Sequence, residues 1–315
     1  MPGNALHRSA LVGLMALALA GSVWAQGELR VNTGAASVSV FDGDRLVMEY
    51  CFDKVPFKPY AKQLLSPGGV NVLRDAPADH LHHHALMFAV AVDDVDFWAE
   101  AGPVGRQVHR SFAPPKLGSV GGTATAAIGE QLDWLRPGED KPVAQESRTI
   151  EVYRDKSLGA SLLTWRTTLA PPQGRQSIKV SGSHYFGLGM RFPASMDNVA
   201  DFFTADGKAT GEVVRGDERL VPGKWCACSG QADGKPVTAV MFDHPDNVRP
   251  VAWFVMGKPF AYLSATLKLH KEPRVVAADK PLALCYGVAV WDGQPKADDI
   301  DKLHRRWLEL VMPKQ

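Results

Sequence analysis

Short runs rich in β-branched and aromatic residues, broken every few positions by Gly, Pro, Asp or Asn, dominate this chain. Such runs are typical of short β-strands joined by turns. Turn signals such as Asp42-Gly43-Asp44 and Pro171-Pro172-Gln173-Gly174 lie between them. The predicted strands are Ser37 to Phe41, Arg45 to Phe52, Leu86 to Val92, Thr149 to Tyr153, Leu162 to Leu169, Val237 to Phe242, Val251 to Met256, Tyr262 to Leu269 and Leu282 to Trp291.

One helix is predicted, from about Ala297 to Met312, where Ile300, Leu303, Trp307 and Leu310 recur at helical spacing. Because strands are not interleaved with helices, a parallel α/β fold is disfavoured. The pattern favours an all-β fold, a large antiparallel β-sandwich with one C-terminal helix. Since no repeat or linker divides the chain, we expect residues 26–315 to form a single domain.

The first 25 residues have the features of a secretory signal peptide. Arg8 precedes the apolar stretch Ala10 to Ala20, and the small residues Val23 and Ala25 fit a cleavage site. An uncleaved membrane anchor is the alternative, but the stretch is shorter than the ~20 residues that cross a bilayer. We therefore expect cleavage after Ala25, a periplasmic or secreted protein, and no membrane span in the mature chain.

The charge of the chain is balanced, with 35 Lys and Arg against 34 Asp and Glu. A basic patch, which nucleic acids attract, is not evident. Nucleic acid is therefore not an expected partner, and the oligomeric state stays open.

Four cysteines are present, Cys51, Cys226, Cys228 and Cys285. An oxidising compartment would permit disulfides among them, whereas small buried thiols are the equally open alternative. Without a C-x-x-C pair, a zinc ribbon or a thioredoxin-like site is disfavoured.

Four of the ten histidines fall within five positions, at His80, His82, His83 and His84. If this segment is extended, alternation places His80, His82 and His84 on one face and His83 on the other. Three imidazoles on one face could bind a divalent transition metal, and a single imidazole could act as an acid or base near neutral pH. The alternative is that the rings only form hydrogen bonds around a turn.

Charged residues stand beside this cluster, namely Arg74, Asp75 and Asp79. Such neighbours shift the pKa values of titrating groups, and they favour a functional site over a merely structural turn.

Three further segments contain residues that could take part in catalysis or binding. Asp243 and His244 follow an apolar strand, where Asp243 could serve as a base, or simply form a turn before Pro245. His184 stands beside a tyrosine. Trp253 could stack against a sugar, although most Trp side chains in a sandwich belong to the core. The G-x-S-x-G, P-loop and H-E-x-x-H motifs are absent from the sequence.

Several of these segments resemble the bacterial PmoA-like family of unknown function. Its motifs Ser-Pro-x-Gly, Arg-Asp and Asp-His-Pro-His-His-Arg-Gly correspond here to Ser66–Gly69, Arg74-Asp75 and Asp79–Ala85. Leu81, His84 and Ala85 depart from the family's Pro, Arg and Gly. The resemblance continues through Phe97–Glu100, Gly105–His109, Glu146–Thr149, His184–Phe192, Lys224–Cys226, Asp243–Asn247 and Tyr286–Val290.

The family name is borrowed from a methane monooxygenase subunit that spans the membrane several times. Because the mature chain has no apolar run of that length, we do not expect methane oxidation.

The all-β pattern with early histidines also resembles the galactose-mutarotase-type supersandwich, whose members bind or act on carbohydrates. Mutarotation needs an acid at the ring oxygen and a base at the anomeric hydroxyl. The resemblance implies His82 or His83 as the acid and Asp243 as the base. The residues expected to contact the substrate are Arg74, Asp75, His80, His184, His244 and Trp253.

Three hypotheses follow. The first is an exported carbohydrate-active protein, an isomerase, lyase or hydrolase on a sugar or modified glycoside. The second is a metal-dependent enzyme, with ligands from His80, His82 and His84 and a carboxylate from Asp79 or Asp243. The third is a sugar-binding module without catalysis.

Overall fold

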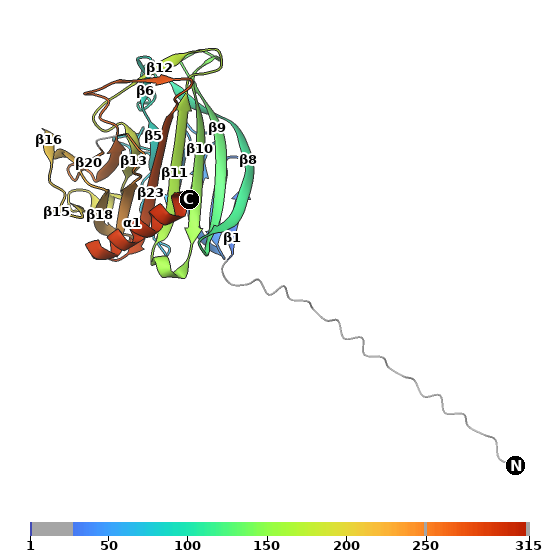
Figure 1. Ribbon diagram of the computed structural model, residues 1–315. Helices are drawn as coiled ribbons and strands as arrows, with labels where there is room; N and C mark the ends of the chain where they lie inside the picture. The colour runs from blue at the N-terminus through green and yellow to red at the C-terminus, as the bar shows by residue number, and fades with distance from the viewer. Residues whose placement is uncertain (2–27, 249–250, 313–315) are drawn as a thin grey trace.

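The computed structural model describes residues 1, 28–248 and 251–312, so the predicted leader after Met1 lies outside the described residues. Its strands pair in antiparallel fashion into two large sheets and a small one (Figure 1). The ten-stranded sheet contains, in spatial order, β1 (Leu29–Thr33), β2 (Ser37–Asp42), β3 (Arg45–Cys51), β4 (Tyr60–Leu64), β5 (Leu86–Ala89), β13 (Gly187–Arg191), β21 (Tyr262–Thr266), β20 (Ala252–Met256), β17 (Glu218–Val221) and β16 (Glu212–Arg215).

The nine-stranded sheet contains β15 (Gly207–Lys208), β14 (Asp201–Thr204), β18 (Trp225–Ala232), β19 (Lys235–Asp243), β23 (Leu282–Asp292), β11 (Ser161–Ala170), β10 (Pro142–Arg154), β9 (Thr123–Leu135) and β8 (Arg106–Val120). The four-stranded sheet contains β22 (Arg274–Ala277), β12 (Ser177–Ser181), β6 (Ala91–Val92) and β7 (Val95–Asp96). Short 3-10 turns occupy Lys156–Leu158 and Ala194–Met196.

The two large sheets pack face to face, because alternate residues of their strands are apolar and buried. Val40 and Met48 of the ten-stranded sheet share one core with Ile150 of β10. Tyr50 and Trp165 touch across the gap, with ring centroids 6.1 Å apart. The antiparallel β-sandwich predicted from the sequence is confirmed.

A buried ionic network also joins the sheets. Arg148 of β10 donates to both carboxylate oxygens of Glu146, at 2.9 and 2.8 Å, and to the hydroxyl of Tyr50 on β3 at 2.8 Å. It also donates to Pro59 O and to Oε1 of Gln107. Since Arg148 and Glu146 are both buried, this pair lies in the interior of the sandwich.

The predicted helix is confirmed as α1 (Ala297–Val311), which lies on the outer face of the nine-stranded sheet (Figure 1). Trp307 packs against Phe242 and donates from Nε1 to the hydroxyl of Thr164 at 2.8 Å. Gly287 of β23 makes room, since an added Cβ would lie 2.8 Å from the Trp307 ring. The helix therefore seals a second core. Among the described residues, no helix is long and apolar enough to cross a bilayer.

The predicted strands all overlap observed ones, although Leu86 to Val92 divides between β5 and β6 in different sheets. The long strands β8 and β9 were not predicted. β8 is an edge strand, and its register against β9 shifts between Ala113 and Lys116, around Pro114 and Pro115.

All four cysteines are free, and Cys226, Cys228 and Cys285 are buried. These three cysteines are therefore small buried thiols, the second of the two alternatives.

Candidate functional site

The histidine cluster lies in the loop between β4 and β5 and is not extended. Two consecutive tight turns form there: the amide of His80 donates to Pro77 O at 2.8 Å, and that of His83 to His80 O at 2.9 Å. The prediction of strand alternation is therefore wrong. The turns gather the rings of His80, His82 and His83, with centroids 4.5 to 5.7 Å apart.

His84 leaves this group. Its Nδ1 lies 2.8 Å from Oδ1 of Asp75, and its Nε2 lies 2.8 Å from Oε1 of Glu100. Because the backbone turns at His83, the predicted metal ligands His80, His82 and His84 are not brought together. In the parts of the chain that the structure describes, no group of three or more His, Cys, Asp or Glu side chains is arranged to hold a metal ion.

A chain of ionic contacts, here called the support cluster, surrounds His84 and comprises Lys58, Tyr60, Asp75, His84 and Glu100. Lys58 is fully buried, with Nζ 2.6 Å from Oε1 of Glu100, and Tyr60 donates to Oδ2 of Asp75 at 2.8 Å. Burial lowers the pKa of Lys58. Burial also opposes a charged His84, but the hydrogen bonds to Asp75 and Glu100 prevail and raise its pKa.

A cavity of about 390 Å³ opens beside the three gathered imidazoles. This size is within the range of small-molecule sites. We call it the histidine pocket, and its lining residues are His80, His82, His83, Tyr185, Arg215, Glu218, Phe254, Met256, Pro259, Phe260 and Tyr262. The ten-stranded sheet positions five of them, Arg215, Glu218, Phe254, Met256 and Tyr262, because β21, β20, β17 and β16 are successive neighbours.

Two of the imidazoles in the pocket, those of His82 and His83, are held neutral. Burial lowers the pKa of His82, with a further contribution from His80, and it lowers the pKa of His83 to about 2. Burial raises the pKa of Tyr262, so the phenol keeps its proton. Within the described chain, Nδ1 of His83 and Oη of Tyr262 are buried and have no hydrogen-bond partner.

Gly189 of β13 accounts for the position of Tyr262. An added Cβ at Gly189 would overlap the phenol oxygen, so only glycine lets the ring lie against this strand.

Glu218 and Arg215 form another part of the wall. Oε1 of the buried Glu218 accepts from Nη2 of Arg215 at 2.7 Å, and its Oε2 lies 2.9 Å from Nε2 of His184. The predicted contact residue His184 therefore bonds to a lining residue without lining the pocket itself. Glu218 and Arg215 were not predicted, and neither were the aromatic residues Phe254, Phe260 and Tyr262.

The other predicted residues lie elsewhere. Arg74 forms an ion pair with Asp197, at 3.3 Å, and Asp75 belongs to the support cluster. Trp253 is fully buried and donates to Gly223 O at 2.7 Å, so it is a core residue.

Asp243 and His244 lie at the end of β19, in the nine-stranded sheet and next to α1. Oδ1 of Asp243 accepts from Asn247 at 2.9 Å, and the ring of His244 lies 6.0 Å from that of Trp307. Neither residue lines the histidine pocket. The proposed pairing of His82 or His83 with Asp243 is thus not formed there, because β19 and the histidine loop belong to different sheets.

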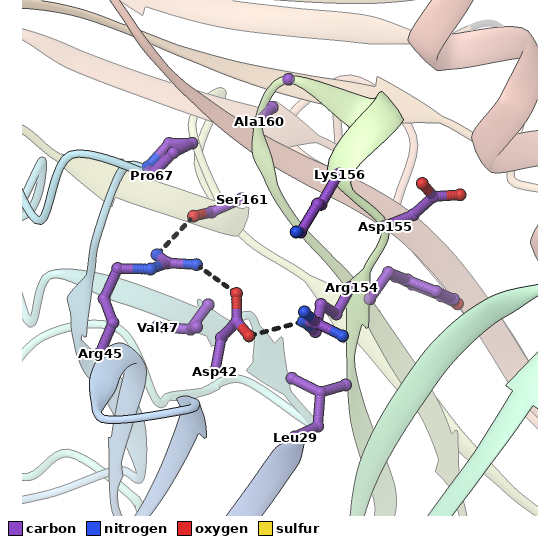
Figure 2. Close-up of a pocket in the computed structure, with 12 residues that line it drawn as sticks. Leu29, Asp42, Arg45, Val47, Pro67, Arg154, Asp155, Lys156, Ala160 and Ser161 are labelled. Atoms are coloured by element: carbon purple, nitrogen blue, oxygen red, sulfur yellow. Dashed lines mark hydrogen bonds and ion pairs between the residues drawn. The ribbon is translucent and has the colours of Figure 1, made fainter. Parts of the chain in front are cut away.

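A second cavity, of about 310 Å³, lies where the turn between β2 and β3 meets β10 and β11 (Figure 2). Asp42 bridges two arginines there, with Oδ2 3.1 Å from Arg45 and Oδ1 2.6 Å from Arg154. Arg45 also donates to the hydroxyl of Ser161 at 3.3 Å. These contacts tie the two sheets together. Because no imidazole is among the lining residues, the histidine pocket is the better candidate for chemistry.

Residues 37–305 match a family described as "Family of unknown function (DUF6807)". That description does not include the PmoA name. A comparison with curated proteins found no match.

Several solved structures are similar in fold. An α-galactosidase from Lactobacillus brevis is 6% identical, with a TM-score of 0.45, over 88% of this chain and 41% of that one. The GH36 α-galactosidase AgaB from Geobacillus stearothermophilus is 9% identical, with a TM-score of 0.48, over 84% and 40%. A TPR-domain containing protein from Parabacteroides distasonis is 8% identical, with a TM-score of 0.39, over 83% and 48%. This chain spans less than half the length of each.

Proposed function

Because the chain belongs to the DUF6807 family, whose description names no activity, we propose a function from the geometry of the histidine pocket. The protein binds a sugar in this pocket and transfers a proton to or from it, as an isomerase or a lyase does.

The observation that carries the proposal is that His83 and Tyr262 line the same pocket and that each has a buried polar atom, Nδ1 and Oη, without a partner among the described residues. A buried polar atom without a partner costs about 1–3 kcal/mol. Hydroxyl groups of a bound sugar would satisfy both atoms.

The aromatic side chains around them support the same ligand. Phe254, Phe260 and Tyr185 line the pocket with Tyr262, and the ring centroids of Tyr185 and Phe254 lie 5.7 Å apart. Flat apolar rings beside a few polar groups suit a sugar, which has apolar C–H faces and a rim of hydroxyls.

The proton chemistry follows from the pKa shifts. His82 is half-buried and its pKa is below the ordinary 6.5, so at neutral pH its imidazole can accept a proton. Tyr262 retains its proton and can donate a hydrogen bond. His83 is also neutral at this pH and would orient the substrate. These roles replace the imidazole acid and Asp243 base expected from the sequence.

Isomerisation or elimination fits better than hydrolysis. Most glycoside hydrolases use two carboxylates that flank the scissile bond. Among the described residues that line the pocket, Glu218 is the one carboxylate, and both its oxygens are engaged.

Export to the periplasm or beyond is part of the proposal. It is supported by the leader pattern in residues 1–25, which lies outside the described residues apart from Met1. N-terminal sequencing of protein from the periplasm or medium should start near Gln26. A mature protein that starts at Met1 would argue against it.

The activity is tested by incubating the tag-free protein in D₂O with neutral, keto and uronic sugars and short oligosaccharides. Proton NMR then follows loss of a C–H signal, exchange between anomers, or a new unsaturated product. We expect turnover with at least one sugar and a loss of about 10²-fold or more in His82→Asn, the scale of general acid–base catalysis.

His109→Asn is the matched control, because this partly exposed histidine bonds to Glu130 away from the pocket. Equal loss in both variants, or full activity in His82→Asn, would contradict the assigned base. If sugars bind but none of them is turned over, the protein would be a sugar-binding module without catalysis.

A further inference from the structure

We infer that the sugar bound in the histidine pocket carries a carboxylate, and that Arg215 binds it at the rim. This inference rests on the proposed function and narrows its substrate class to acidic sugars.

Arg215 lines the pocket from a place where the edge strand is irregular. Arg215 ends β16, the edge strand, whose register against β17 shifts between Val213 and Arg215. Bulges at sheet edges bend the strand and re-aim a side chain, and they are frequent beside active sites. Here the bulge accompanies a side chain that lines the cavity from the edge strand.

Glu218 holds one side of the guanidinium group. Nη2 of Arg215 donates to Glu218 at 2.7 Å, and the buried Glu218 is in turn bonded to His184 at 2.9 Å. The arginine is therefore anchored through a carboxylate that is itself fixed. This anchoring lowers the entropy that Arg215 would lose on binding a ligand.

The rest of the guanidinium group is available. Within the described residues, Nε and Nη1 of Arg215 have no hydrogen-bond or ion-pair partner, and the side chain is 78% exposed. Arginine presents pairs of parallel N–H groups that match the two oxygens of a carboxylate. Among the described residues, the contact of Glu218 with Arg215 is through Nη2, which leaves Nε and Nη1 to a ligand.

Tyr185 adds a polar group on the same side. Arg215 and the Tyr185 phenol influence each other electrostatically, and both line the pocket. The Tyr185 ring also lies among the pocket aromatics, 5.7 Å from that of Phe254. A sugar ring against these aromatics would thus have its acidic group next to a cation.

The remaining charges around the pocket do not offset this preference. His82 and His83 are neutral, and the negative charge of Glu218 is shared by its two partners. Among the described lining residues, Arg215 is therefore the one cation with unused donors. A neutral sugar would leave these donors to solvent.

Isothermal titration with matched pairs tests the inference: galactose against galacturonate, glucose against glucuronate and mannose against mannuronate. In at least one pair, we expect the acid to bind about tenfold more tightly or better, the scale of a charged hydrogen bond. Arg215→Gln should remove this preference while the affinity for the neutral sugar stays within about twofold. Because Arg215 is exposed, the variant is expected to fold.

Arg110→Gln is the control, since this half-exposed arginine pairs with Asp133 on the other sheet. It should leave the preference intact. Equal affinities for acid and neutral sugar, or a preference that survives in Arg215→Gln, would overturn the inference and leave the proposed function standing. If no sugar of either kind binds, both are wrong.

Discussion

Nδ1 of His84 lies 2.8 Å from Oδ1 of Asp75, while the three histidines before it line a cavity. Two carboxylates thus hold the imidazole of His84, whereas His80 has one such contact, with its Nδ1 3.1 Å from Oδ2 of Asp79. The support cluster therefore holds the histidine turn in place. The pKa of His84 is raised, whereas the pKa values of His82 and His83 are lowered.

The first prediction concerns stability as a function of pH. The folded pKa of His84 is above its ordinary 6.5, so its contribution is fully present below pH 6.5 and is lost as pH rises through the raised value. Burial opposes ionisation of Asp75 and Glu100, but bonds with His84 and other partners hold their pKa values below 3.8 and 4.5. Their contributions are lost as pH falls through those depressed values.

His84→Gln should therefore reduce the free energy of unfolding most between about pH 4.5 and 6.5, by about 3 kcal/mol. Urea titrations of both proteins from pH 4 to 9 measure the difference. A difference that does not change with pH would show that His84 acts by packing alone.

The second prediction concerns the pocket imidazoles. The pKa of His83 is lowered to about 2, so its ring should stay neutral from pH 8 down to pH 4, whereas His82 should titrate below 6.5. Nitrogen-15 NMR of labelled imidazoles follows both, and the His83→Asn and His82→Asn variants assign the signals. A His83 signal that titrates near 6.5 would mean that the ring is open to solvent.

The third prediction concerns the ionic network between the sheets. Arg148→Ala leaves the buried Glu146 without its cation and should cost about 3–5 kcal/mol. Arg110→Ala, which removes a half-exposed pair, should cost less than about 1 kcal/mol. Chemical denaturation measures both, and adding Glu146→Gln to Arg148→Ala should restore part of the loss. Equal losses of unfolding free energy in the two variants would contradict a special contribution of the buried network to stability.

The fourth prediction concerns the thiols. Burial raises the pKa values of Cys51 and Cys285 to about 11, and those of Cys226 and Cys228 are raised further. Thiolates are the reactive form, so folded protein should react slowly with Ellman's reagent at pH 8. Denatured protein should release four thiols per chain. Two missing thiols would reveal a disulfide.

The fifth prediction concerns Gly189. Gly189→Ala would push Tyr262 away from β13, so ligand binding should fall about tenfold or more and stability by about 1–3 kcal/mol. Gly118→Ala is the control, because its Cβ would meet only Thr125 Oγ1 at an ordinary 3.7 Å. Calorimetric titration and thermal melts compare them. Unchanged ligand affinity in Gly189→Ala would place the ligand away from Tyr262.

Much of the fold could be predicted from local pattern. Strands such as β3 and β20 are rich in apolar residues, and α1 has an apolar face at helical spacing. β8 and β9 escaped prediction because Ala, Gly, Ser and Pro interrupt their apolar and β-branched residues. Their extended form comes from pairing with neighbours and not from their own propensity.

Of the residues that line the histidine pocket, the histidines alone were predicted from the sequence. His80, His82 and His83 are close in sequence, so a local pattern was enough to find them. Glu218 and Tyr262 reach the same pocket only because β17, β20 and β21 pair side by side. Asp243 was a plausible partner by residue type, but strand pairing places it in the other sheet.

The two prolines of β8 have a consequence beyond the register shift. Successive residues of a strand direct their amides to opposite sides, and proline has no amide hydrogen. One of Pro114 and Pro115 therefore removes a donor towards β9, where the pairing is interrupted, and the other removes one from the outward side. A strand of another copy cannot continue the nine-stranded sheet there in unbroken register, which guards this long edge against growth into fibrils when the protein is concentrated.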